Sequence, residues 1–212
     1  MKKIYCISGL GADQRVFHNL KIDNAHFEYL SWITPAKNES IEDYAFRMSL
    51  QVKENDPVLM GVSFGGMMSI EIAKIKTVQK LILISSVKSI GELPAWMKVT
   101  GKLKLNLLMP PRSPQWMSPI ADNYLGVTSG EEKTLAKSFR EIVSPDYLHW
   151  AVDKVLNWQN TDHPAPIFHI HGTHDKTFPI RNIRPTHAIQ NGGHFMVMNK
   201  ADEISAIVKG LL

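Results

Sequence analysis

Short apolar runs alternate with helical patterns in the first half of the chain. Four runs, at 3–7, 26–32, 58–62 and 80–86, are bounded by polar or Gly- and Pro-containing stretches. Nearly continuous apolar runs of this length are typical of strands in a parallel sheet that is covered on both faces. After Ser40, which begins a capping-box sequence, the apolar positions recur at helical spacing. The pattern therefore predicts an α/β fold.

The alternation lapses between residues 87 and 158. Prolines divide this stretch, and Ser129 and Ser144 each have the sequence context of a helix start. We interpret 87–158 as a helical lid or cap inserted into a single domain that spans residues 1–212. Apolar side chains of this segment are core packing when each is considered alone, but a lid over a substrate pocket also needs such a lining. The candidate substrate-binding residues are Trp96, Met97, Trp116 and Met117.

Strand signals resume after the insertion. Residues 166–172 form a further apolar run, 186–189 form a last short one, and 199–202 begin a closing helix. The sheet is therefore expected to have about six strands, all within one domain.

The third apolar run ends in Gly61-Val62-Ser63-Phe64-Gly65, directly before a helical pattern. This G-x-S-x-G sequence is typical of a tight strand-to-helix turn that holds a serine hydroxyl clear of its neighbours. Glycines at 61 and 65 lack the Cβ atoms that would collide as the turn closes. The Phe64 N–H, at the start of the new helix, could stabilise an oxyanion beside Ser63. The alternative is a Gly-rich connection without chemistry.

Three further loops lie at predicted carboxyl ends of strands. The loop Ser8-Gly9-Leu10-Gly11 follows the first strand, and the Leu10 N–H is a candidate second oxyanion donor. Asp175 follows the strand at 166–172, and His194 follows the run at 186–189. Catalytic groups in open parallel sheets collect beyond these ends, so we expect Ser63, Asp175 and His194 to meet. Glu92 is the alternative acid.

These motifs, in this order, resemble those of the α/β-hydrolase superfamily, and the resemblance covers nearly the whole chain. It implies a small serine hydrolase with a three-layer sandwich, a mostly parallel sheet in the spatial order 2-1-3-4-5-6, and the family's usual first two strands missing. It also implies the roles of the catalytic groups: Ser63 as nucleophile, His194 as general base and then acid, and Asp175 as the residue that orients the imidazole.

The chain departs from the family pattern at two places. Ser8 stands where the oxyanion loop of the family usually has histidine, so the hydrogen bonding inside this loop must differ. Only 19 positions separate Asp175 from His194, so the connection between the last two strands must be short or irregular.

Composition narrows the functional classes. The chain has 24 Lys and Arg against 20 Asp and Glu, and its basic residues are scattered, so nucleic-acid binding is not expected. Cys6 is the only cysteine, which excludes an internal disulfide and favours a cytoplasmic location. The apolar run near the N-terminus is too short for a signal-peptide core, and no stretch approaches the roughly 18 apolar residues of a membrane span.

The predicted reaction is hydrolysis of an ester or thioester of a small, largely apolar substrate through an acyl-enzyme on Ser63, with no cofactor or metal. One alternative is a non-catalytic small-molecule receptor on the same fold. A zinc hydrolase is a second alternative, since His169, His171 and His174 lie close in sequence. An anionic substrate is a third, with three candidate arginines: Arg112, Arg181 and Arg184.

Overall fold

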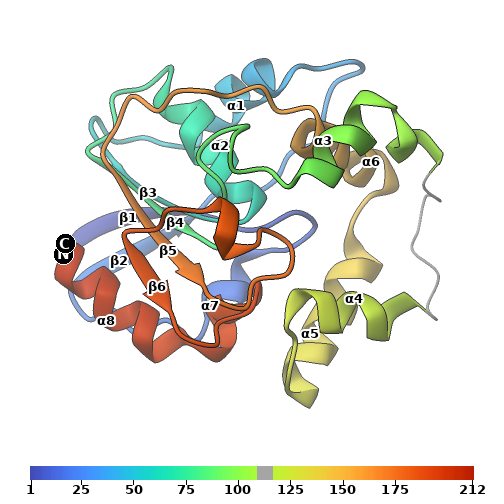
Figure 1. Cartoon of the computed structure of the whole chain (residues 1–212). Helices are drawn as coiled ribbons and strands as arrows, with labels where there is room; N and C mark the ends of the chain where they lie inside the picture. Colours follow the sequence, from blue (N-terminus) through green and yellow to red (C-terminus); the bar gives the residue numbers. More distant parts are fainter. Residues whose placement is uncertain (109–116) are drawn as a thin grey trace.

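The computed structural model describes residues 1–108 and 117–212. Its centre is a six-stranded sheet in the order β2-β1-β3-β4-β5-β6, and every neighbouring pair is parallel. The strands are β1 (Lys2–Ile7), β2 (Ala25–Tyr29), β3 (Val58–Val62), β4 (Lys80–Ile84), β5 (Ile167–Gly172) and β6 (His187–Ile189). Both the parallel sheet and its strand order confirm the sequence prediction (Figure 1).

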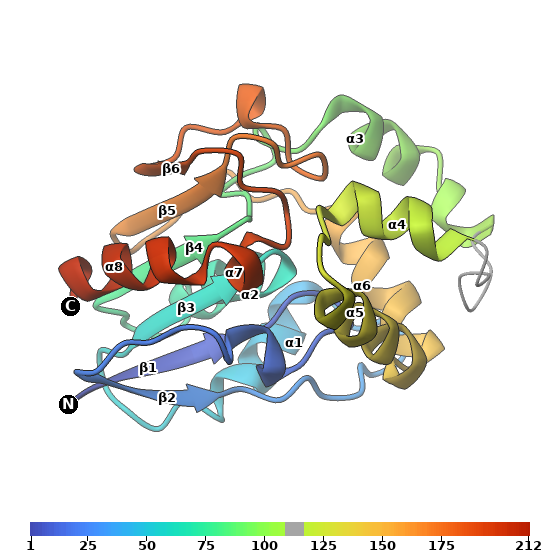
Figure 2. The same ribbon diagram turned by 90° about the horizontal axis from the view of Figure 1, so that it is seen from below.

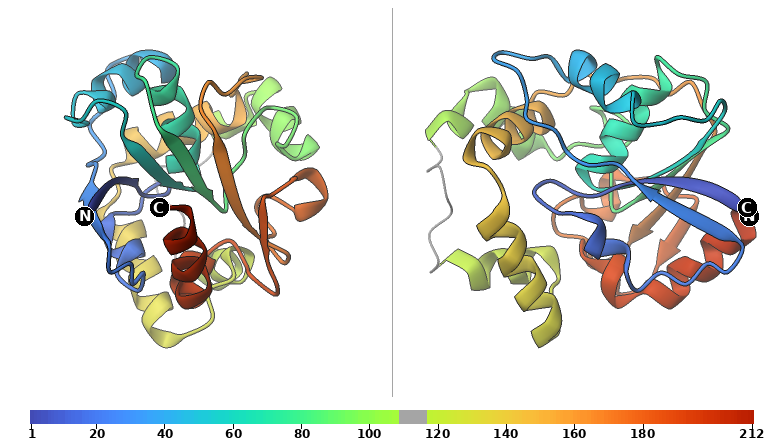
Figure 3. Two further views of the ribbon diagram at one scale, coloured as in Figure 1. Left: turned by 90° about the vertical axis from the view of Figure 1, so that its left-hand side faces the viewer. Right: turned by 180° about the vertical axis from the view of Figure 1, so that it is seen from behind.

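Helices cover both faces of the sheet. One face packs on α1 (Ile41–Ser49) and α2 (Phe64–Ala73), and the other packs on α7 (Met196–Asn199) and α8 (Ala201–Leu211). The right-hand view of Figure 3 shows α1 on one side of the sheet and α8 on the other. The result is the expected three-layer sandwich.

The strands divide their side chains between two cores. In β1, Tyr5 and Ile7 join the core beneath α1 and α2, whereas Ile4 and Cys6 join the core beneath α7 and α8. Successive side chains of a strand point to opposite faces, so a strand covered on both sides must be apolar at every position. This explains the continuous apolar runs.

Between β4 and β5 the described residues form five helices. They are α3 (Ala95–Lys102), η2 (Leu105–Leu108), α4 (Ser118–Leu125), α5 (Gly130–Ile142) and α6 (Pro145–Leu156). Figure 2 shows α3 to α6 beyond the carboxyl ends of the strands. Helices begin after Ser129 and Ser144, as the sequence predicts: Ser129 forms a capping box with Glu132, and Pro145 occupies the first turn of α6.

Two details of the sheet bear on the sequence predictions: the end of β2 and the connection between β5 and β6. The second strand ends at Tyr29 rather than Trp32, because Tyr29 pairs with Cys6 near the end of β1 and no partner strand continues beyond. Between β5 and β6 the only helical turn among the described residues is η4 (Ile180–Asn182), as the short spacing requires. Within the ranges described, no helix is both long and apolar enough to cross a membrane.

Candidate active site

Ser63 occupies a strained position between β3 and α2. Its backbone has φ 53° and ψ −120°, a left-handed conformation that non-glycine residues rarely adopt. The Ser63 N–H donates to Ile84 O at 2.9 Å, and its carbonyl accepts from Ser86 Oγ at 2.7 Å. Both backbone groups are thus fixed by the neighbouring strand β4 and the residues after it, which hold the side chain at the apex of the turn.

The glycines around Ser63 are required by backbone contacts. A Cβ on Gly61 would lie 2.3 Å from Gly65 O, and a Cβ on Gly65 would lie 2.2 Å from Ile7 O. No heavy atoms approach so closely without displacement of the backbone. The contact between the two arms of the turn confirms the steric role predicted for these glycines.

His194 connects Ser63 with Asp175. Its Nε2 lies 2.9 Å from Ser63 Oγ, and its Nδ1 lies 2.8 Å from Asp175 Oδ2. A carboxylate only accepts hydrogen bonds, so Nδ1 donates to Asp175 and Nε2 is left to accept the serine proton. The structure therefore brings together the three side chains that the sequence singled out.

Asp175 is held from both sides of its carboxylate. Oδ1 accepts hydrogen bonds from the N–H groups of Thr177 at 2.8 Å and Phe178 at 2.9 Å, while Oδ2 faces His194. Burial raises the pKa of Asp175, but the charge and hydrogen bond of His194, with smaller effects of His171 and the Phe178 N–H, outweigh it and hold the pKa below its ordinary value. The aspartate is accordingly anionic at neutral pH.

Two buried histidines lie behind this aspartate. His171 Nε2 lies 2.7 Å from Phe178 O and 3.5 Å from Asp175 Oδ2, and His171 Nδ1 lies 3.3 Å from His169 Nε2. Burial lowers the pKa of both imidazoles, that of His169 to about 3 with a further contribution from His171. Both rings are therefore neutral. Through its hydrogen bond to Phe178 O, His171 stabilises the loop that carries Asp175.

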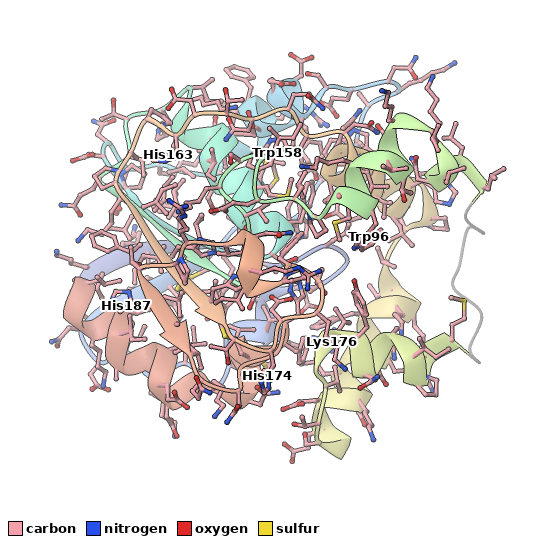
Figure 4. All side chains as sticks on the ribbon, viewed as in Figure 1. Trp96, Trp158, His163, His174, Lys176 and His187 are labelled. Atoms are coloured by element: carbon pink, nitrogen blue, oxygen red, sulfur yellow. The ribbon has the colours of Figure 1, made fainter. Side chains whose placement is uncertain are left out.

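Two of the alternatives do not match this geometry. Glu92 Oε2 accepts from the Lys88 N–H at 2.7 Å, so this carboxylate serves its own loop, whereas the Nδ1 of His194 is occupied by Asp175. His174 is exposed at the surface (Figure 4), while His169 and His171 are fully buried. Among the described residues no three His, Cys, Asp or Glu side chains are grouped to hold a metal ion.

The loop after β1 lies beside Ser63. A Cβ on Gly9 would lie 3.6 Å from Ser63 Cβ, and Leu10 and Phe64 line the same cavity as Ser63. In the described part of the chain neither the Leu10 nor the Phe64 N–H donates to another group of the protein. Both amides are therefore available to a ligand beside the serine.

Ser63 and His194 line an apolar cavity of about 360 Å³. Its apolar lining includes residues of the loop after β1 and of α4 and α5, among them Ala12, Ala121, Leu125, Ala136, Phe139 and Val143. Among the described residues that line it, Arg140 alone carries a permanent charge, and Arg140 Nη1 donates to Asp122 Oδ1 at 2.8 Å. This ion pair leaves the cavity without a net charge.

Only one of the described candidate substrate-binding residues lines the cavity. Met97 lines the cavity, whereas Trp96, labelled in Figure 4, is 51% exposed and Met117 is 39% exposed, and neither is among the lining residues. Consecutive residues of a helix point about 100° apart, so Met97 can face inward while Trp96 faces solvent. Trp116 lies outside the described residues. The residues of α4 and α5 that line the cavity were not singled out in the sequence, because their apolar spacing is that of any packed helix.

The arginines considered for an anionic substrate do not contribute to this cavity within the described ranges. Arg181 and Arg184 lie between β5 and β6 and are exposed. Arg112 lies outside the described residues.

Comparison with solved structures gives the same fold over the full length of the chain. An esterase from Exiguobacterium antarcticum has a TM-score of 0.76 at 14% identity, with 100% of this chain and 91% of that chain covered. MenH from S. aureus has a TM-score of 0.74 at 18% identity, covering 100% and 93%. A thermophilic esterase from Thermogutta terrifontis has a TM-score of 0.73 at 13% identity, covering 100% and 89%.

No curated protein sequence matches the chain. The sequence profile of the Alpha/beta hydrolase family, in contrast, matches residues 10–207, from the loop after β1 to the last helix. The chain therefore belongs to the alpha/beta hydrolase family.

Proposed function

We propose that the protein is a serine hydrolase that cleaves an ester or thioester with a small, apolar acyl group. The observation that carries this proposal is the hydrogen-bonded series Ser63, His194 and Asp175, of which Ser63 and His194 line an apolar cavity. A serine hydroxyl becomes nucleophilic when a neighbouring base removes its proton, and this geometry supplies the base and the group that orients it.

In the proposed first step, Ser63 Oγ attacks the acyl carbonyl carbon while His194 Nε2 accepts the serine proton. The tetrahedral intermediate carries its negative charge on the former carbonyl oxygen, and the N–H groups of Leu10 and Phe64 stabilise it. His194 then protonates the departing alcohol or thiol as the bond between it and the acyl carbon breaks. Asp175 remains anionic throughout and stabilises the imidazolium.

In the second step, water replaces the departed group. His194 accepts a proton from this water, the resulting hydroxide attacks the acyl-enzyme, and the ester bond to Ser63 breaks as His194 returns the proton to Oγ. The products are a carboxylic acid and the free enzyme.

The lining of the cavity supports specificity for an apolar acyl group. Its lining is largely aliphatic and aromatic, and Arg140 is already paired with Asp122. An uncharged chain therefore binds there without leaving a buried charge unpaired. The buried single cysteine, Cys6, fits a cytoplasmic enzyme.

Two measurements test the proposal. A fluorophosphonate probe is expected to label the wild type and not Ser63→Ala, and a p-nitrophenyl ester series is expected to give activity that rises with acyl length until the cavity is filled. Absence of labelling in the folded wild type would favour a non-catalytic receptor. Activity that rises with negative charge rather than with chain length would refute the apolar acyl site.

A further inference from the structure

Ser8, at the end of β1, accepts a hydrogen bond from a tryptophan outside the catalytic group. The Trp32 indole N–H donates to Ser8 Oγ at 2.9 Å, and Ser8 Oγ donates to Ala12 O at 2.8 Å. A serine hydroxyl has a single proton, so the hydrogen bond from Trp32 fixes the direction in which Ser8 donates. Ser8 is 3% exposed, and water has little access to compete with either bond.

The bond from Ser8 closes the loop that carries Leu10. Ala12 N–H donates to Gly9 O at 3.1 Å, which makes residues 9–12 a β-turn, and Gly11 at its third position has φ 70°. This is the backbone conformation that a type II turn requires at that position. With Gly9 O and Ala12 O both occupied, the turn is tied at each end and the Leu10 N–H remains free.

Trp32 also contacts the second oxyanion donor. Its ring stacks on that of Phe64 with centroids 5.3 Å apart and an interplanar angle of 13°. The start of α2 packs directly on the oxyanion loop as well, because a Cβ on Gly65 would lie 2.4 Å from Ser8 O. Trp32 and Ser8 thus contact both backbone segments from which the two N–H groups project.

We propose that Trp32 and Ser8 act as positioning residues that set the distance and angle between the Leu10 and Phe64 N–H groups, which on the proposed function form the oxyanion hole. Neither side chain touches the reacting atoms in this assignment. The indole N–H of Trp32 acts through Ser8 on the position of the Leu10 N–H. Its ring acts on the position of Phe64, so one side chain affects both donors.

The physical reason lies in how an oxyanion hole works. Its donors stabilise charge that develops only in the transition state, and they do so without reorganisation only if they already stand 2.7–3.1 Å from the oxygen. The pairing of β1 with β3 and the backbone packing at Gly65 bring the loop after β1 and the turn after β3 together. The contacts of Trp32 and Ser8 then set their fine position. A misplacement of about 1 Å costs on the order of 100-fold in rate.

The test is a double-mutant cycle of Ser8→Ala, Trp32→Phe and the double variant. Trp32→Phe retains an aromatic ring against Phe64 but lacks the N–H, and Ser8→Ala lacks the hydroxyl that both bonds share. Each single variant is expected to lower kcat by about 10- to 100-fold with KM changed less than about threefold. The double variant is expected to lose little more than the worse single variant, because both remove the same bonded series.

A second readout distinguishes positioning from general destabilisation. A trifluoromethyl ketone, whose adduct with serine places an oxyanion in the hole, is expected to bind the variants more weakly by the same factor as kcat falls. Trp150→Phe is the matched control: it removes an indole N–H bond, to Glu39 O at 2.9 Å, from the same aromatic cluster without touching Ser8. Its kcat is expected to stay within about twofold of the wild type.

The outcomes separate this inference from the proposed function. If the wild type hydrolyses esters through Ser63 but kcat and inhibitor affinity are unchanged in the folded Ser8→Ala and Trp32→Phe variants, the positioning role is wrong and the hydrolase assignment stands. Equal losses in Trp150→Phe would also overturn it. If the wild type neither hydrolyses esters nor reacts with a fluorophosphonate, the proposed function itself fails.

Discussion

His194 Nε2 lies 2.9 Å from Ser63 Oγ although 131 positions separate the two residues. Ser63 follows β3 and His194 follows the edge strand β6, with β4 and β5 between them. Because parallel strands present their carboxyl ends along one edge of the sheet, residues from distant loops reach one another there. The proposed catalytic geometry therefore depends on the register of half the sheet.

The first prediction concerns Gly65, two residues after Ser63. We predict that Gly65→Ala lowers the free energy of unfolding by about 3 kcal/mol or more, because its Cβ would lie 2.2 Å from Ile7 O and 2.4 Å from Ser8 O. Gly130→Ala is the control, since a Cβ there meets nothing within 4 Å. It should be neutral or stabilising by up to about 1 kcal/mol. Urea denaturation measures both, and equal stabilities would contradict the packing described.

The second prediction separates stability from activity at Ser63. We expect Ser63→Gly to be more stable to urea than Ser63→Ala by about 1 kcal/mol, because φ 53° with ψ −120° strains any residue that has a Cβ. Both variants should be inactive. Identical unfolding midpoints would show that the turn stores no strain.

The third prediction concerns acyl-chain length. Ala136 on α5 lines the cavity and is buried. Ala136→Leu is expected to fill the cavity and to shift the preferred p-nitrophenyl ester to a shorter chain, with at least a tenfold loss of kcat/KM on the longest good substrate, about 1.4 kcal/mol. Activity on the acetate ester should change little. An unchanged length profile would place the acyl group elsewhere.

The fourth prediction concerns stability at low pH. Burial lowers the pKa of His169 from 6.5 to about 3, so between these values the unfolded chain binds a proton that the folded protein does not. The His169 contribution to stability is therefore lost as the pH falls below 6.5, by about 2 kcal/mol at pH 5. His169→Gln should show a correspondingly shallower decline in unfolding free energy between pH 7 and 5. Parallel profiles for the two proteins would argue that the buried imidazole does not titrate as described.

The sequence predicted the centre of the sheet well because β3 and β4 are covered on both faces. Such strands must be apolar throughout, and the glycines of the Ser63 turn have no alternative that fits. The position of Ser63 follows from local chemistry alone. The proximity of His194 and Asp175 to Ser63 follows only from the expectation that all three come after the carboxyl ends of parallel strands, since their loops carry no comparable local constraint.

The cavity walls and the Trp32 contact could not be predicted in the same way. Ala136 and Phe139 lie on a helix face whose pattern is the same whether it meets a core or a substrate. The pattern predicts a strand that ends at Trp32, but the strand ends at Tyr29 and the Trp32 indole contacts Ser8 from the segment that follows. This contact depends on how the segment after β2 packs on the loop after β1, which is a tertiary property.

The most direct test of the central claim is to trap the covalent intermediate. The enzyme is mixed with a p-nitrophenyl ester of medium chain length, quenched in acid within the first turnover, digested and analysed by mass spectrometry. We predict an acyl adduct on the peptide that contains Ser63, formed at the rate of the p-nitrophenol burst and absent from Ser63→Ala. Turnover without an adduct at Ser63, or an adduct elsewhere that persists in Ser63→Ala, would contradict the assignment.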